Sequence, residues 1–101
     1  MQPIKARELL KAVPGELISG DLDTKITGVS TDTRTIQEGD LFFALMGASS
    51  DGHKFLADAL MKGASGVVVS RKVEARVFAL RVEDTLAALG QLAAYYRSKF
   101  N

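Results

Sequence analysis

The chain has 101 residues, 47% hydrophobic and 25% charged, with a formal net charge of +1. These values fit one compact domain with its own core and argue against disorder. The balanced charge gives no general attraction for nucleic acid or membranes, so an anionic ligand would need a local set of donors. The sequence has no cysteine, which excludes disulfides and cysteine metal sites. With no membrane-length apolar run and no signal-peptide core, we expect a soluble cytoplasmic protein.

The first half of the chain predicts one helix and three extended segments. Apolar residues at near-helical spacing predict a helix over residues 4–13, which Pro14 ends. Residues 16–19 and 25–32 predict short extended segments. The unbroken apolar run 41–46 predicts a strand that is buried on both faces.

The second half predicts a helix over 55–61, strands over 66–69 and 76–82, and a final helix over 85–100. Gly63 lies where a glycine would end the first of these helices, and the segment Glu83-Asp84-Thr85 can cap the start of the second. This order of elements predicts a small single α/β domain, a mixed sheet flanked by helices. We expect the core-facing stripe of the last helix to contain Leu86, Leu89, Leu92, Ala93 and Tyr96.

The loop 47–54 joins a predicted strand to a predicted helix, where a phosphate-binding loop would lie. The spacing of Gly47 and Gly52 matches a P-loop, but Lys and Ser or Thr should follow, and the chain has His53-Lys54-Phe55. We therefore exclude ATP hydrolysis at this loop. Backbone N–H groups and Ser hydroxyls could still bind a polar or anionic group, and an ordinary surface loop fits equally well.

The segment 30–34 carries three hydroxyl side chains and ends on Arg34. Such donors and acceptors suit a nucleotide base or a diphosphate. The alternative is a turn in which Asp32 pairs with Arg34 and the hydroxyls bond to local backbone. His53 is the only histidine, and a structural role at a helix start is favoured over a base or metal ligand. The residues by themselves predict no catalytic residue and no metal site.

Taken in order, these segments resemble the N-terminal domain of the Mur ligases, and the resemblance covers nearly the whole chain. The matching segments are Ser30-Thr31-Asp32-Thr33-Arg34, residues 38–45, Gly47, residues 51–55 and residues 59–69. Mur ligases use ATP and Mg²⁺ to join an amino acid or dipeptide to a UDP-N-acetylmuramoyl peptide. The resemblance implies that residues 1–101 are the domain that binds the UDP end of this substrate. The central ATP-binding domain and the C-terminal domain would then lie outside this chain, which alone would have no cofactor and no activity.

Within the family, Ala44-Leu45-Met46-Gly47 is similar to the Ala-Leu-Lys-Gly stretch of the ligases that add D-alanyl-D-alanine. The sibling that adds diaminopimelate or lysine often has proline before this glycine, and it shares most of the other motifs. A second alternative is a non-catalytic interaction domain similar to the N-terminal domain of HPr kinase.

The resemblance also implies roles for individual residues. Those expected to contact the UDP moiety are Thr31, Thr33, Ala48, Ser49 and Ser50. Those expected to support the site structurally are Ser30, Asp32, Arg34, Gly47, Asp51, Gly52 and His53. Many relatives that add D-alanyl-D-alanine carry charged and aromatic residues in place of Ala48-Ser49-Ser50.

Overall fold

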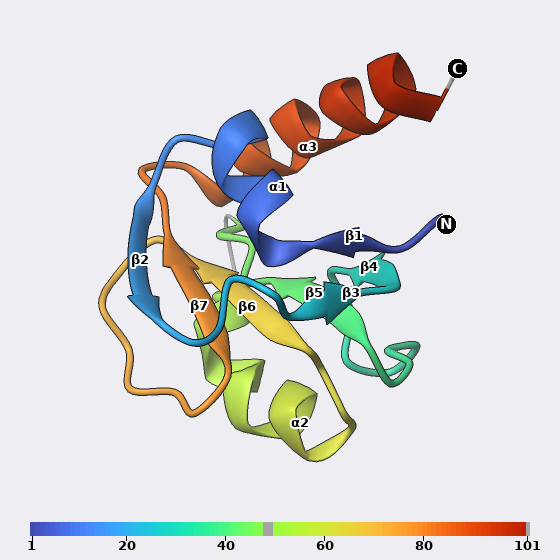
Figure 1. Ribbon diagram of the computed structural model, residues 1–101. Helices are drawn as coiled ribbons and strands as arrows, with labels where there is room; N and C mark the ends of the chain where they lie inside the picture. Colours follow the sequence, from blue (N-terminus) through green and yellow to red (C-terminus); the bar gives the residue numbers. More distant parts are fainter. Residues whose placement is uncertain (48–49, 101) are drawn as a thin grey trace.

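The computed structural model describes residues 1–47 and 50–100, which form a five-stranded mixed sheet with helices on both faces (Figure 1). The strand order is β2-β7-β6-β5-β4, in which all neighbours are parallel except the β2–β7 pair. The strands are β2 (Glu16–Ser19), β4 (Gly28–Ser30), β5 (Asp40–Phe43), β6 (Gly66–Val69) and β7 (Phe78–Arg81). A separate antiparallel pair joins β1 (Ile4–Lys5) to β3 (Lys25–Ile26). The predicted fold class is confirmed.

The three central strands of the sheet, β5, β6 and β7, are buried on both faces because their residues point alternately to two hydrophobic clusters. Leu41 and Phe43 of β5 belong to the cluster beneath α1 (Ala6–Ala12) and α3 (Thr85–Phe100). Phe42 belongs to the opposite cluster, which α2 (Leu56–Met61) covers. Figure 1 shows these helices on opposite sides of the sheet. This burial explains the unbroken apolar runs of β5 and β6. The strand predicted over residues 41–46 is buried on both faces, as expected, but it spans Asp40–Phe43 and ends before residue 44.

The predicted helix over residues 4–13 is shorter than expected, because Ile4–Lys5 pairs with β3 and the helix begins at Ala6. The predicted stripe of α3 is also partly wrong. Leu86 is 65% exposed and Ala93 is exposed, whereas the buried positions are Thr85, Ala88 and Leu92. The small side chains of Thr85 and Ala88 are the ones buried against the sheet, and hydrophobicity alone did not identify that face.

The predicted helix ends are confirmed by hydrogen bonds. The Asp84 carboxylate accepts from the backbone N–H groups of Leu86 and Ala87 at 2.9 and 3.1 Å and so caps α3. After α2, Gly63 has a φ of 93°, and the N–H of Ala64 donates to the Ala59 carbonyl at 3.1 Å. This is the bonding of a Schellman motif, which requires a left-handed residue and therefore favours glycine. It turns the chain directly into β6.

The topology brings the predicted site residues to one edge of the sheet. Residues 31–34 follow β4, residues 44–53 follow β5, and residues 70–71 follow β6. These strands are parallel neighbours, so their carboxyl ends meet at the same edge, where open α/β sheets bind ligands. Among the described residues, no helix is long and apolar enough to cross a membrane.

Candidate functional site

The turn after β4 is held by three of the predicted support residues. The Ser30 hydroxyl donates to the Asp32 carbonyl at 2.9 Å and accepts from the Asp32 N–H at 3.1 Å. The Asp32 carboxylate accepts from the Arg34 N–H at 2.8 Å and from its guanidinium at 2.7 to 3.1 Å. These guanidinium bonds, followed by the backbone bond, lower the pKa of Asp32 to about 2. Asp32 and Arg34 therefore form a local ion pair, as the turn interpretation predicted.

The two threonines of this turn remain available to a ligand. Within the described chain, neither the Thr31 nor the Thr33 hydroxyl has a hydrogen-bond partner. Thr33 is only 7% exposed, and no polar side-chain atom among the described residues is both fully buried and unpaired. Lys62, at the end of α2, donates to the Thr33 carbonyl at 2.7 Å and fixes the turn against the helix. The turn thus presents two hydroxyls on a backbone that is held by the Ser30 and Asp32 side chains within the turn and by Lys62 after α2.

The loop after β5 returns on itself before the next helix begins. The Gly47 N–H donates to the Ser50 carbonyl at 2.8 Å, Met46 pairs with Asp51, and the Gly52 N–H donates to the Leu45 carbonyl at 2.7 Å. A Cβ on Gly52 would lie 2.7 Å from the Leu45 nitrogen, so only glycine fits this close approach. Two of the predicted contact residues, Ala48 and Ser49, lie outside the described residues.

A ring of hydrogen bonds ties this loop to the end of β6. The Asp51 carboxylate accepts from the His53 N–H at 2.9 Å, from His53 Nδ1 at 2.7 Å and from Arg71 at 2.8 Å. His53 Nε2 accepts from the Ser70 N–H at 3.0 Å. The His53 N–H and ring, and then the Arg71 guanidinium, hold the pKa of Asp51 well below its usual range. We call Asp51, His53, Ser70 and Arg71 the loop latch.

The loop latch includes an Asp-His-Ser set that the sequence did not reveal, because Ser70 lies 17 residues from His53. It differs from a catalytic triad in its bonds. The Nε2 lone pair is already used by the Ser70 backbone N–H, and the Ser70 hydroxyl is 3.5 Å away. The His53 side chain is 2% exposed, so no substrate can reach it. This arrangement suits a structural histidine, as the sequence favoured, and not a general base.

An open depression of about 520 Å³ lies between the turn and the loop. Its lining residues are Thr31, Asp32, Thr33, Arg34, Phe42, Ser50 and Phe55. The structure therefore brings Thr31, Thr33 and Ser50 together, as expected for one binding site.

The sequence analysis placed both phenylalanines of this lining, Phe42 and Phe55, among the hydrophobic residues that should be buried. That holds for Phe42, which is 1% exposed, but Phe55 is 48% exposed. The sequence analysis also did not identify Lys62 and Arg71 as residues of the site, because their contacts join segments that are far apart in the sequence.

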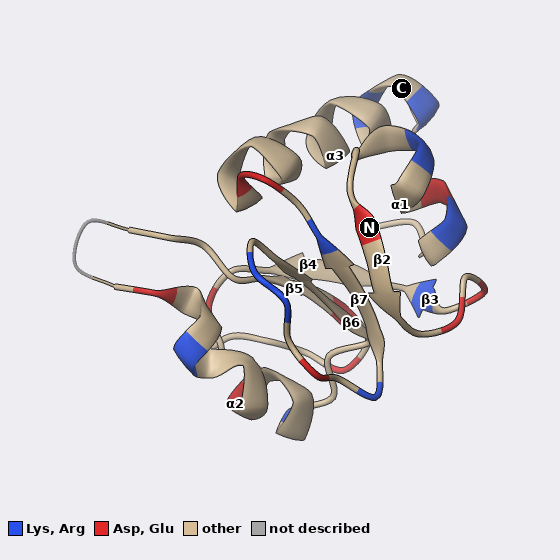
Figure 2. Cartoon of the chain, turned by 90° about the vertical axis from the view of Figure 1, so that its left-hand side faces the viewer, with Lys and Arg blue, Asp and Glu red and all other residues tan. Residues whose placement is uncertain are grey.

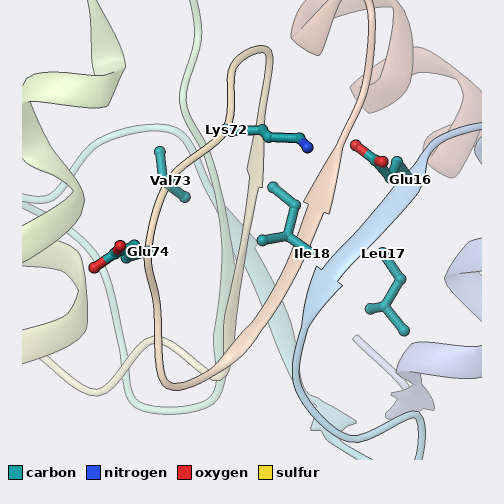
Figure 3. Close-up of a pocket in the computed structure, with 6 residues that line it drawn as sticks. All are labelled: Glu16, Leu17, Ile18, Lys72, Val73 and Glu74. Carbon is teal, nitrogen blue, oxygen red and sulfur yellow. The ribbon is translucent and has the colours of Figure 1, made fainter.

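A second depression, of about 480 Å³, lies between β2 and the segment after β6 (Figure 3). Figure 3 shows the Lys72 amino group and the Glu16 carboxylate pointing toward each other, while Glu74 points away. With two carboxylates and one ammonium in its lining, this depression is a poor site for an anionic ligand. In Figure 2 the acidic and basic segments are interspersed along the visible side of the chain. Recognition of an anion would therefore depend on local donors.

Comparison with known proteins identifies the family. Residues 25–97 match the family model described as "Mur ligase family, catalytic domain", and the chain therefore belongs to the Mur ligase family.

Individual relatives fall in two branches. The chain is 47% identical over 81 residues, 77% of its length, to the UDP-N-acetylmuramoyl-tripeptide--D-alanyl-D-alanine ligase of Synechocystis sp.. It is 39% identical over 95 residues, 92% of its length, to the UDP-N-acetylmuramoyl-L-alanyl-D-glutamate--2,6-diaminopimelate ligase of Syntrophomonas wolfei. A solved D-alanyl-D-alanyl ligase from Acinetobacter baumannii superposes on 98% of the chain, with a TM-score of 0.87 and 36% identity. The chain spans 18%, 19% and 22% of these three proteins, respectively.

Proposed function

We propose that this chain is the domain of a Mur ligase that binds the UDP end of a UDP-N-acetylmuramoyl peptide. The observation that carries the proposal is a pair of hydroxyls, Thr31 and Thr33, which have no partner among the described residues. They lie at the carboxyl end of β4 in a depression shared with Ser50. A hydroxyl can both donate and accept, so the pair suits the alternating carbonyl and N–H groups on the edge of a uracil base.

The other predicted residues take supporting roles in this proposal. Ser30, Asp32 and Arg34 bond to one another and set the turn, and Gly47, Gly52 and the loop latch set the loop that carries Ser50. Ala48 and Ser49 are proposed to complete the pocket from that loop. An isolated wall of an interdomain site should bind weakly, with an affinity near millimolar, or roughly 4 kcal/mol.

We infer further that the whole protein is an ATP- and Mg²⁺-dependent cytoplasmic ligase that adds D-alanyl-D-alanine, with residues 1–101 as its first domain. The 47% identity to the Synechocystis enzyme and the likeness to the Acinetobacter structure support this branch. The diaminopimelate-adding branch is the second candidate, because one of its members matches 92% of the chain. Both relatives are named for UDP-N-acetylmuramoyl substrates, so the proposed role of the depression is the same in either branch.

The test of the site is a titration of the chain and its Thr33→Val variant with UDP-N-acetylmuramoyl peptide. Valine keeps the shape of threonine and removes the hydroxyl, so we expect about fivefold weaker binding at unchanged stability. Thr35→Val is the matched control, since Thr35 belongs to the same turn but does not line the depression. Equal affinities for the wild type and Thr33→Val would contradict the site assignment.

The proposal also predicts no ATP hydrolysis by these 101 residues alone, because the P-loop and magnesium sites would belong to the central domain. A phosphate-release assay of the purified chain checks this. ATP hydrolysis that exceeds the rate in buffer and co-purifies with the chain would contradict the proposal that a separate domain carries the ATP-binding site.

A further inference from the structure

We propose that Phe55 is the stacking platform for the uracil base of the bound substrate, an inference that rests on the proposed function. Phe55 ends the 3₁₀ helix Gly52–Phe55 and lines the depression that Thr31 and Thr33 also line. Phe55 is 48% exposed, although the following helix residues Leu56 and Leu60 pack against a core cluster. Phe55 belongs to neither hydrophobic cluster of the described chain. Its apolar face is therefore available to a ligand.

The backbone that carries the ring is fixed before any ligand binds. Two residues earlier, His53 is held by the loop latch, and the Lys54 N–H donates to the Asp51 carbonyl at 3.1 Å. The N–H of the next residue, Leu56, donates to the His53 carbonyl. A phenyl ring also has only two side-chain torsions to restrict on binding. Stacking of a ligand on Phe55 should therefore cost little conformational entropy of the backbone and side chain at this part of the site.

The combination of groups indicates the class of ligand. An aromatic face beside hydroxyls that can donate and accept matches a flat heterocycle, which offers a π-face and a polar edge. A diphosphate alone would use neither the ring nor the hydroxyl acceptors. Stacking of a base on an aromatic side chain changes affinity by roughly tenfold in alanine substitutions. Phe55 would thus recognise the base end, and the more exposed parts of the site would face the diphosphate and sugar.

Phe55→Trp gives a direct test, because the chain contains no tryptophan and the new indole would be the sole reporter. The variant is titrated with uridine, UDP and inorganic pyrophosphate, with excitation beyond the absorption of the base. We expect saturable quenching by uridine and UDP and none by pyrophosphate. Met61→Trp is the matched control, since Met61 lies on the following helix and is 86% exposed away from the depression. Its fluorescence should not respond to any of the three.

Amide shifts of Thr31 and Thr33, followed by NMR in the same Phe55→Trp samples, separate the two proposals. Shifts that saturate together with the quenching support both. Saturating shifts without quenching would overturn the stacking role and leave the proposed site intact. Absence of both signals at millimolar uridine and UDP would contradict both proposals. As a second variant, Phe55→Ala should weaken binding of uridine and UDP by the same factor, about tenfold, whereas Met61→Ala should change neither. Unchanged affinity in Phe55→Ala would also overturn the inference.

Discussion

Replacement of His53 by alanine tests whether the loop latch stabilises the fold. The His53 side chain is 2% exposed and makes two bonds, from Nδ1 to Asp51 at 2.7 Å and from the Ser70 N–H to Nε2 at 3.0 Å. Alanine removes both bonds and leaves the Ser70 N–H without its acceptor. Asp51 keeps its bond to Arg71, so the carboxylate stays paired.

The size of the effect follows from these contacts. An unpaired buried N–H costs about 1–3 kcal/mol, and the lost burial of the ring adds about 1 kcal/mol. We therefore expect His53→Ala to lower the free energy of unfolding by roughly 2–4 kcal/mol. For a domain of about 100 residues this corresponds to a fall in Tm of roughly 10–20 °C.

Urea and thermal unfolding followed by circular dichroism measure this change. His53→Gln should recover part of the loss, because its amide oxygen can accept from the Ser70 N–H. Lys54→Ala is the control, since Lys54 is an exposed neighbour whose side chain makes no described bond, and it should change stability by less than about 0.5 kcal/mol. If His53→Ala were no more destabilising than Lys54→Ala, the structural role of the loop latch would be refuted.

Two further predictions concern stability. The pKa values of Asp32 and Asp51 are lowered in the folded state, so their stabilising contribution is complete above about pH 4 and is lost as the pH falls toward 2. Unfolding titrations should show this loss, with a shallower fall in Asp51→Asn; equal slopes would contradict it. Gly52→Ala should destabilise the fold by about 1–3 kcal/mol because its Cβ would meet the backbone of residues 44–45. Gly90→Ala, with open space in α3, should stabilise it by about 0.5–1 kcal/mol, and a reversal of these signs in urea unfolding would contradict the packing described.

Much of the fold could be predicted from local signals. The strands Glu16–Ser19 and Gly66–Val69 agree with the predicted bounds, because turn residues mark their ends. Gly63 and the segment Glu83-Asp84-Thr85 identified helix ends, since the glycine supplies the required conformation and Asp84 of the segment supplies the capping bond. The two-residue strand β1 was missed, because its pairing with β3 depends on a partner about 20 residues away.

The candidate site was predictable where its residues are close in sequence and not where they are distant. The Asp32–Arg34 pair is a local contact, and one of the two interpretations of its segment predicted it. The bonds of Lys62 to Thr33 and of Ser70 and Arg71 to the loop depend on the positions of neighbouring strands. Such positions follow from the sheet order, which the pattern of hydrophobic residues does not specify.

The most direct test of the central claim is an NMR titration of the chain with UDP-N-acetylmuramoyl peptide at millimolar concentration. We expect shifts confined to residues 30–34 and 47–52 and to Phe55, which lines the same depression. Shifts centred instead on the depression of Glu16 and Lys72, or no shifts at all, would contradict the assignment of the UDP-binding site.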